Sequence, residues 1–185
     1  MIHNALSFLS VQVNQYLNKE LETASDLIEI GVLKQSDGSP SFENIGMTLV
    51  AIDREITIPY GLDMKEVNTS TSQVIKQKRP LCLNLKVLVS SNFESNYEDA
   101  LKYLGKVIGF FHTNNVFSHE NSPTLDQDIQ RLIVEINPND TDDMYHIWSM
   151  AGISYLPPII YRVRMLAFAS EVSKVLPALK GMQSV

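Results

Sequence analysis

The sequence has 185 residues, of which 44% are hydrophobic and 19% are charged, a balance that fits one globular domain and excludes a disordered chain. Acidic residues outnumber basic residues by 21 to 15, which gives a net charge of −6. A nucleic-acid partner is therefore not expected, because phosphate contacts require Lys and Arg. The single cysteine excludes a framework of disulfides within the chain.

The first third of the sequence predicts one long helix followed by two strands. Apolar residues at spacings of three and four predict an amphipathic helix over residues 2–22. The weakly alternating segment 27–33 predicts a short strand that ends in a turn. The β-branched segment 45–58 predicts one long or bent strand that extends beyond the body of the sheet. Near its end, Arg54 and Glu55 interrupt its apolar character.

The middle third predicts a loop, a strand and a helix. Residues 59–79 have little to bury, so they are expected to form a surface loop that is either mobile or held by a partner. Residues 81–90 alternate between apolar and polar side chains, which predicts a strand. Ser95 and Glu98 have the spacing of a capping box and predict the start of a helix there. Its apolar residues continue at helical spacing to Phe111.

The last third predicts two more strands with a helix between them. Residues 131–136 predict one strand, and residues 159–168 predict the other. The acidic residues that follow the first strand suit the positive end of a helix dipole. Gly152 is expected to end that helix. The final residues, 170–185, are weakly patterned and are expected to form an arm.

Helices interspersed among strands predict an α+β fold, an α/β sandwich. We expect one mixed, mainly antiparallel sheet flanked by about three helices. The domain is expected to cover residues 1–169, and residues 170–185 are expected to form a C-terminal arm. The sequence shows the pattern of neither a signal peptide nor a membrane span, so a cytoplasmic protein without membrane contacts is expected.

The familiar motifs of catalysis and cofactor binding are missing from the sequence. HExxH, GxSxG, GxxxxGK[ST] and GxGxxG do not occur, and no two histidines are four residues apart. The acid pair Asp126 and Asp128 and the acids at the predicted helix start have no apolar surroundings that would raise a pKa. We therefore expect no enzyme activity, no catalytic residue, no cofactor and no metal.

Two groups of residues are candidates for binding a partner. Arg162 and Arg164 alternate with apolar residues in the last strand, so both side chains point to one face. That face is either simply solvated or docks against an acidic partner, which the forked guanidinium group suits. Trp148 and Tyr155 flank Gly152 and belong either to the core or to an interface. The candidate partner-binding residues are Arg54, Glu55, Trp148, Tyr155, Arg162 and Arg164.

Several segments of the sequence resemble those of one bacterial family. The segment from Met144 to Pro158, MYHIWSMAGISYLPP, and the YRVR that begins at Tyr161 are similar to the family's C-terminal signature. Residues 80–85 and 97–104 are similar to its strand and its central helix. On these residues the chain resembles the tail terminator, or cap, of contractile injection systems. The family includes antifeeding-prophage and virulence-cassette particles and was formerly known only as a domain of unknown function.

The resemblance implies a structural role without a reaction. The family's members end the polymerisation of the sheath and the inner tube, so we expect a ring of this chain, a hexamer, that contacts sheath and inner-tube subunits. The segments 45–58, 59–79 and 170–185 are the expected contacts. A C-terminal module found in longer relatives is expected to be absent. The resemblance implies neither a nucleic-acid nor a membrane partner.

Three alternatives remain open. The chain could be a related tail-completion protein or sheath adaptor that occupies another position in the same particle. It could be a small-ligand or peptide-binding α+β domain, in which residues 59–79 form a lid. It could also be a hydrolase with an unrecognised site, which would require two or more titratable groups that converge in one cleft.

Overall fold

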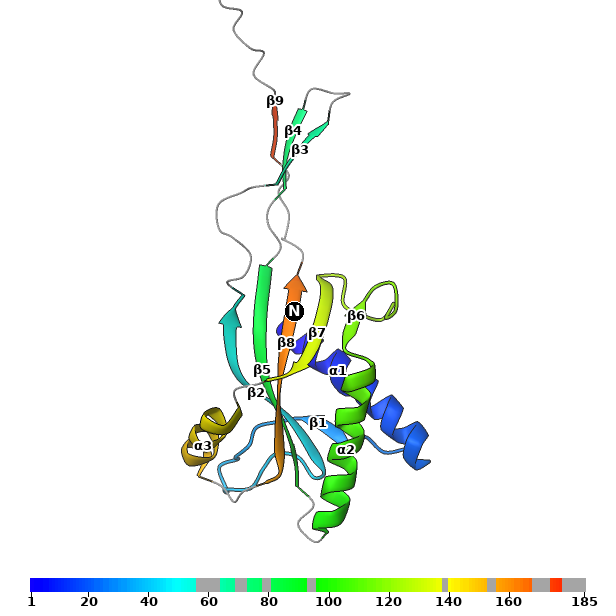
Figure 1. Cartoon of the computed structure of the whole chain (residues 1–185), viewed down its shortest axis with the longest axis vertical. Helices are drawn as coiled ribbons and strands as arrows, with labels where there is room; N and C mark the ends of the chain where they lie inside the picture. The colour runs from blue at the N-terminus through cyan, green and yellow to red at the C-terminus, as the bar shows by residue number, and fades with distance from the viewer. Residues whose placement is uncertain are drawn as a thin grey trace, which may run out of the picture.

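The fold is a curled six-stranded sheet with two helices against its inner face and a third helix on the other face, plus a second, smaller sheet (Figure 1). The computed structural model describes residues 1–55, 64–68, 73–77, 81–92, 96–137, 140–152, 156–167 and 174–177. This architecture confirms the predicted α+β fold with one mixed, mainly antiparallel sheet and three helices in the described residues.

The six strands run in the order β1-β2-β5-β8-β7-β6. β1 is parallel to β2, and every other neighbouring pair is antiparallel. The helices are α1 (Ile2–Leu21), α2 (Tyr97–Thr113) and α3 (Asp140–Ala151). The strands of this sheet are β1 (Ile28–Ile30), β2 (Ile45–Arg54), β5 (Leu81–Ser91), β6 (Val116–Ser118), β7 (Ile129–Ile136) and β8 (Pro158–Ala167).

A second, antiparallel sheet contains β3 (Met64–Asn68), β4 (Gln73–Gln77) and β9 (Lys174–Pro177) in the order β3-β4-β9. The prediction of a loop over residues 59–79 is therefore wrong for β3 and β4. Likewise, the expected arm, residues 170–185, contains a strand. Local patterning could not show this, because β4 pairs with a strand about a hundred residues away along the chain.

The three connections to the small sheet leave the six-stranded sheet at one end. β2 ends at Arg54, which pairs with Leu83, and β5 begins at Leu81, which pairs with the last residue of β8, Ala167. Three residues separate Gln77 from Leu81. Even a fully extended chain of that length reaches only about 14 Å. The small sheet is therefore tethered close to this end of the six-stranded sheet.

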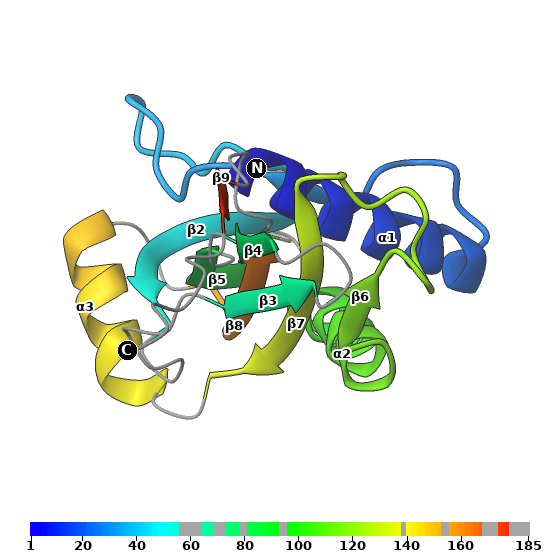
Figure 2. The ribbon, with the colours of Figure 1, turned by 90° about the horizontal axis from the view of Figure 1, so that it is seen from above.

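The main core fills the space between the inner face of the curled sheet and helices α1 and α2 (Figure 2). The predicted stripe of α1 is buried, and Phe8 meets Phe117 of β6 edge to face, with ring centroids 5.5 Å apart. From β5, Leu85, Val87 and Val89 point into this core, as their alternation predicts. The buried apolar residues of the two helices are Ala5, Leu6, Phe8, Leu9, Val13, Leu17, Ala100, Leu104, Val107, Phe110 and Phe111.

The start of α2 lies one residue later than the sequence predicts. Asn96 is the N-cap, and its side-chain oxygen accepts a hydrogen bond from the backbone N–H of Asp99. Glu98 therefore occupies the second helical position and not the third, which a capping box requires. Ser95 lies outside the described residues. The error arose because Asn96 and Asp99 repeat the same polar-to-acidic spacing one residue further on.

β2 is the long, irregular strand that the sequence predicts, although residues 56–58 of that prediction lie outside the described residues. Its register against β5 shifts between Leu49 and Ala51, so Val50 forms a β-bulge. A bulge reverses which face the following side chains occupy. This reversal decides which charged residues at the end of β2 lie on the outer face of the sheet.

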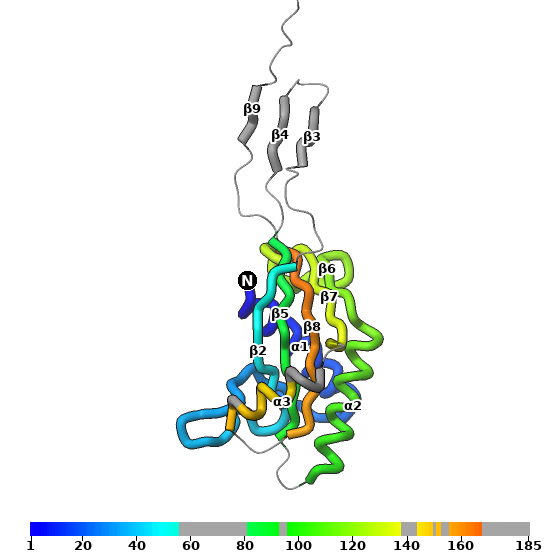
Figure 3. The backbone as a smooth tube through the Cα atoms, turned by 60° about the vertical axis from the view of Figure 1, so that its left-hand side comes forward, coloured from blue at the N-terminus to red at the C-terminus, as the bar shows by residue number. Residues whose placement is uncertain are grey.

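α3 covers the lower part of the sheet's outer face (Figure 3). Met144, Ile147, Trp148 and Ala151 pack against a second apolar cluster of Leu33, Phe42, Leu88 and Ile160, which confirms the predicted buried face of this helix. Gly152 has a φ of 59° and its N–H donates to the carbonyl of Trp148 at 3.0 Å. The predicted glycine end of α3 is therefore confirmed.

Candidate functional site

The part of the outer face that α3 leaves open carries a group of charged side chains. Seven of these residues lie on β2, β5, β7 and β8, and Glu55 directly follows β2. We define the charged face as Asp53, Glu55, Asn84, Lys86, Arg131, Glu135, Arg162 and Arg164. All are half-buried or exposed. The opposite side of the same strands carries the buried main core.

Strand register places these residues on one face. Arg162 pairs with Lys86 on one side and with Glu135 on the other. Arg164 is likewise directly opposite Asn84 on the β5 side. Residues directly opposite one another in a sheet point to the same face, and residues two apart along a strand do so as well. The predicted orientation of the two arginines to one face is confirmed by this register.

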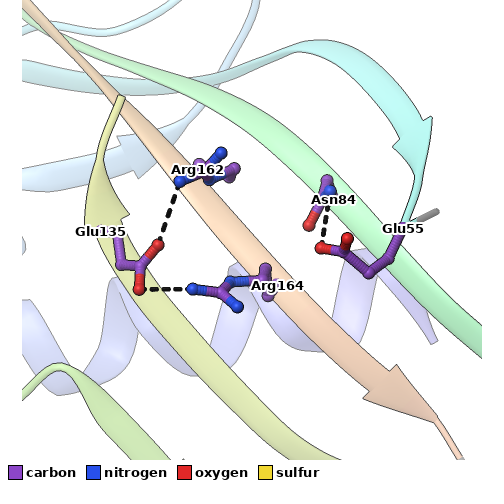
Figure 4. A network of polar contacts seen from close by, with 5 residues as sticks. All are labelled: Glu55, Asn84, Glu135, Arg162 and Arg164. Carbon is purple, nitrogen blue, oxygen red and sulfur yellow. Dashed lines mark hydrogen bonds and ion pairs between the residues drawn. The ribbon is translucent and has the colours of Figure 1, made fainter. Parts of the chain in front are cut away.

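Glu135 joins the two arginines (Figure 4). Arg162 donates to one carboxylate oxygen at 3.2 Å, and Arg164 donates to the other at 2.6 Å. The three side chains are 40%, 41% and 34% exposed, respectively for Arg162, Arg164 and Glu135. Water screens pairs this exposed, so each contributes about 0.2–1 kcal/mol to stability. The contacts orient the arginines more than they stabilise the fold.

A second polar contact lies on the β5 side of this face. The side-chain amide of Asn84 donates to the Glu55 carboxylate at 3.0 Å (Figure 4). The backbone N–H of Glu55 donates to the carbonyl of Cys82, so the pairing of β2 with β5 continues to this residue. Burial, and to a lesser extent the Glu55 carboxylate, raises the pKa of the Cys82 thiol. A raised pKa keeps this thiol protonated near neutral pH.

The charged face has a different charge balance from the whole chain. Its four cations, Lys86, Arg131, Arg162 and Arg164, face three carboxylates, Asp53, Glu55 and Glu135, whereas the chain as a whole carries a net charge of −6. One carboxylate, Glu135, serves two guanidinium groups. A guanidinium group has five N–H donors, so both arginines retain donors that an acidic partner could use.

The structure separates the six residues that the sequence suggested. Arg162, Arg164 and Glu55 share the charged face, but Arg54 pairs with Leu83 and lies on the other side of the sheet. Trp148 lies in the half-buried face of α3, against the second apolar cluster. Tyr155 lies outside the described residues.

Sequence reasoning missed Glu135 and Asn84. Each is a polar residue that alternates with apolar neighbours in a strand, and that local signal was visible for both. The strand order could not be predicted, because nothing near Glu135 or Asn84 in the sequence indicates that β7 and β5 are the two neighbours of β8. Pairing β8 with every other predicted strand and looking for a carboxylate opposite the arginines would have suggested Glu135.

The described residues hold neither a metal-binding cluster nor a membrane-spanning helix. No three His, Cys, Asp or Glu side chains in those residues gather into a group that could hold a metal ion. Each helix in the same part of the chain is too short or too polar to cross a membrane.

The fold and the charged face together define an α+β protein with a curled sheet, of which one face is core and the other is partly open. The chain belongs to the family described as the Pvc16 N-terminal domain, whose model matches residues 7–179. This family assignment confirms the resemblance to the tail terminators of contractile injection systems. No curated protein matches the chain.

Two solved structures have a similar fold. One is the sheath/tube terminator of PVC, an extracellular contractile injection system, in its extended state, with a TM-score of 0.65 and 10% sequence identity over 100% of this chain. The other is the tube terminating cap of the anti-feeding prophage, with a TM-score of 0.57 and 12% identity over 95% of this chain. This chain spans 62% and 60% of the lengths of these two proteins.

Proposed function

We propose that this chain is a structural subunit of the cap that ends the sheath and inner tube of a contractile injection particle. The observation that carries the proposal is the family match, which covers residues 7–179 and so nearly the whole chain. The similarity in fold to two terminators supports it. The role we propose requires no reaction and no cofactor.

We propose that the cap is a closed ring of identical subunits, a hexamer, that forms on the finished tube in the cytoplasm. A ring requires a head-to-tail interface, in which two different surfaces of the chain meet. The charged face, with more cations than carboxylates on an acidic chain, suits one half of such an interface. Acidic surface elsewhere on a neighbouring subunit, or on a sheath or tube subunit, suits the other half.

The small sheet is the second candidate contact. Its outer strands, β3 and β9, each pair with one strand only, β4, among the described residues. An edge strand of this kind can accept a strand from another chain through backbone hydrogen bonds. This supports the expectation that segments 59–79 and 170–185 contact neighbouring subunits of the particle.

Removing the gene from a bacterium that makes the particle tests the proposal. We expect sheaths and tubes of uncontrolled length, or few intact particles, and complementation with the intact gene should restore a narrow length distribution in electron micrographs. A strain that lacks the gene and still makes particles of normal length and number would contradict the cap assignment. It would favour an adaptor or a ligand-binding role instead.

A further inference from the structure

Each of the two outermost strands of the six-stranded sheet forms backbone hydrogen bonds with the side chain of one asparagine. β1 is the outermost strand on one side and β6 on the other. On an edge strand, every second residue directs its N–H and C=O away from the sheet, where they can pair with a strand from another chain. The contacts of these outward groups therefore decide whether the sheet can be extended.

On β1, the outward residue Ile28 is held by Asn14 of α1. The Asn14 side chain accepts a hydrogen bond from the N–H of Ile28 and donates one to its carbonyl, both at 2.9 Å. Ser10 also donates to this carbonyl, at 3.1 Å. Asn14 is only 5% exposed. Its amide group thus takes the place that the backbone of a seventh strand would occupy.

Two residues further along β1, no hydrogen bond from another described residue covers the edge at Ile30, and the edge is covered again at Val32. Ile28 and Ile30 alternate with residues that bond to β2, so the peptide groups of Ile30 also point outward. Just after the strand, the N–H of Val32 donates to the hydroxyl of Ser41 at 2.7 Å, and the N–H of Ser41 donates to the carbonyl of Val32 at 3.1 Å. One open residue is too short to hold an added strand.

On β6, Asn121 makes the corresponding pair of bonds. Its side chain accepts from the N–H of Ser118 and donates to the carbonyl of Val116, each at 2.8 Å. The carbonyl of Ser118 accepts from the backbone N–H of Ser122, also at 2.8 Å. Both outward residues of this three-residue strand are therefore engaged within the chain, by the loop that follows the strand.

We propose that Asn14 and Asn121 are edge-locking residues, which close the β1 and β6 edges of the six-stranded sheet to the addition of a β-strand from a neighbouring chain. β1 pairs with only Ile45–Met47 of β2, so these locks do not close the rest of β2. The inference rests on the hydrogen bonds at the two edges and does not depend on the proposed cap function. In a cap, it has a direct consequence. Backbone pairing with other subunits is excluded from β1 and β6 and is left to other strands, which include the part of β2 beyond Met47 and the strands of the small sheet.

The test combines Asn14→Ala and Asn121→Ala in one chain, with Asn92→Ala as the matched control. Asn92 also donates from its side chain to a backbone carbonyl, that of Phe42 at 3.1 Å, but it directly follows β5, which lies inside the sheet and not at an edge. Circular dichroism would establish that each variant is folded. Light scattering after size exclusion would give its mass, and thioflavin T fluorescence would report new intermolecular sheet.

We expect the double variant to associate with increasing concentration, to at least about twice the mass of the parent chain, and to increase thioflavin T fluorescence. The control should behave like the parent. A folded double variant that keeps the parent's mass at every concentration would overturn the proposal. Equal association of the control and the double variant would overturn it too, because general destabilisation would then explain the effect.

Hydrogen exchange of the unaltered chain tests the same proposal without any substitution. The amides of Ile28 and Ser118 donate to the two asparagines, whereas the outward amide of Ile30 does not. Locked edges predict that the first two amides exchange at least about tenfold more slowly than that of Ile30. Exchange of all three at a similar rate would show that the locks do not persist in solution and would also overturn the proposal.

Discussion

Reversing both arginines of the charged face, Arg162→Glu with Arg164→Glu, should abolish assembly and leave the fold intact. The substitutions remove two ion pairs with Glu135, at 3.2 and 2.6 Å, and place three carboxylates together. Because the side chains are about 40% exposed, each lost pair costs about 0.2–1 kcal/mol, and the new repulsion costs a similar amount. A total of about 1–3 kcal/mol is small beside a typical stability of about 5–15 kcal/mol.

If the charged face meets an acidic partner, the loss of association should be much larger than the loss of stability. Arginines at the centre of an interface commonly contribute about 2 kcal/mol or more each, which is about a 30-fold change in Kd. The assay is electron microscopy of particles from a strain that carries the variant as its only copy. We expect few particles of normal length, together with a melting temperature only slightly below that of the parent.

The matched control is Lys102→Glu with Lys106→Glu on α2. It makes the same change in net charge and also breaks two ion pairs, Lys102 with Asp99 at 2.9 Å and Lys106 with Glu20 at 3.3 Å. These lysines lie away from the charged face, so particles should form normally. Normal assembly by the Arg162 and Arg164 variant would refute the reasoning, and a defect in both variants would trace the effect to net charge alone.

Three further substitutions test the account of the fold. Gly46→Ala should lower the melting temperature strongly, because the new Cβ would lie 2.2 Å from the ring of Phe42; an unchanged melting temperature would contradict this packing. Gly152→Ala should cost about 1 kcal/mol in urea denaturation, because the left-handed φ of 59° strains any residue with a Cβ. Burial raises the pKa of Tyr161, so ionisation favours the unfolded chain and stability should fall as pH rises above about 10, the pKa of an unfolded tyrosine. Tyr161→Phe should reduce this fall and should cost little near neutral pH, since the hydroxyl has no hydrogen-bond partner in the described residues; a large loss at neutral pH would contradict that.

Elements with a strong local pattern could be predicted from the sequence. The alternation in β5 predicts that Leu85 and Val87 share the core face, and both are at most 1% exposed. The acids in the first turn of α3 and Gly152 after its last residue predict both ends of that helix. In each case the residues that determine the structure are neighbours in the chain, so the pattern and its cause are visible together.

The composition of the charged face could not be predicted, because it depends on contacts that are distant in sequence. The bulge at Val50 decides that Glu55, and not Arg54, lies on that face. Without the extra residue, alternation would have placed Arg54 there instead. The sequence marks both as charged residues at the end of a long strand, but it contains no local signal for the bulge.

The roles of the edge-locking residues Asn14 and Asn121 could not be predicted from the sequence for the same reason. An asparagine in the middle of an amphipathic helix reads as a surface residue, yet Asn14 is buried because the helix lies along the free side of β1. Only the relative position of α1 and β1 gives this side chain its role. Asn121 lies in a polar loop, and its role likewise becomes apparent only once β6 is known to be an edge strand.

The most direct test of the central claim is to locate this chain in assembled particles. A compact tag fused to the chain and labelled with gold can be mapped on purified particles by electron microscopy, with an untagged strain as the control. The account predicts one cluster of label at a single end of each sheathed tube, the end opposite the baseplate. Label along the whole sheath, label at the baseplate, or particles without label would contradict it.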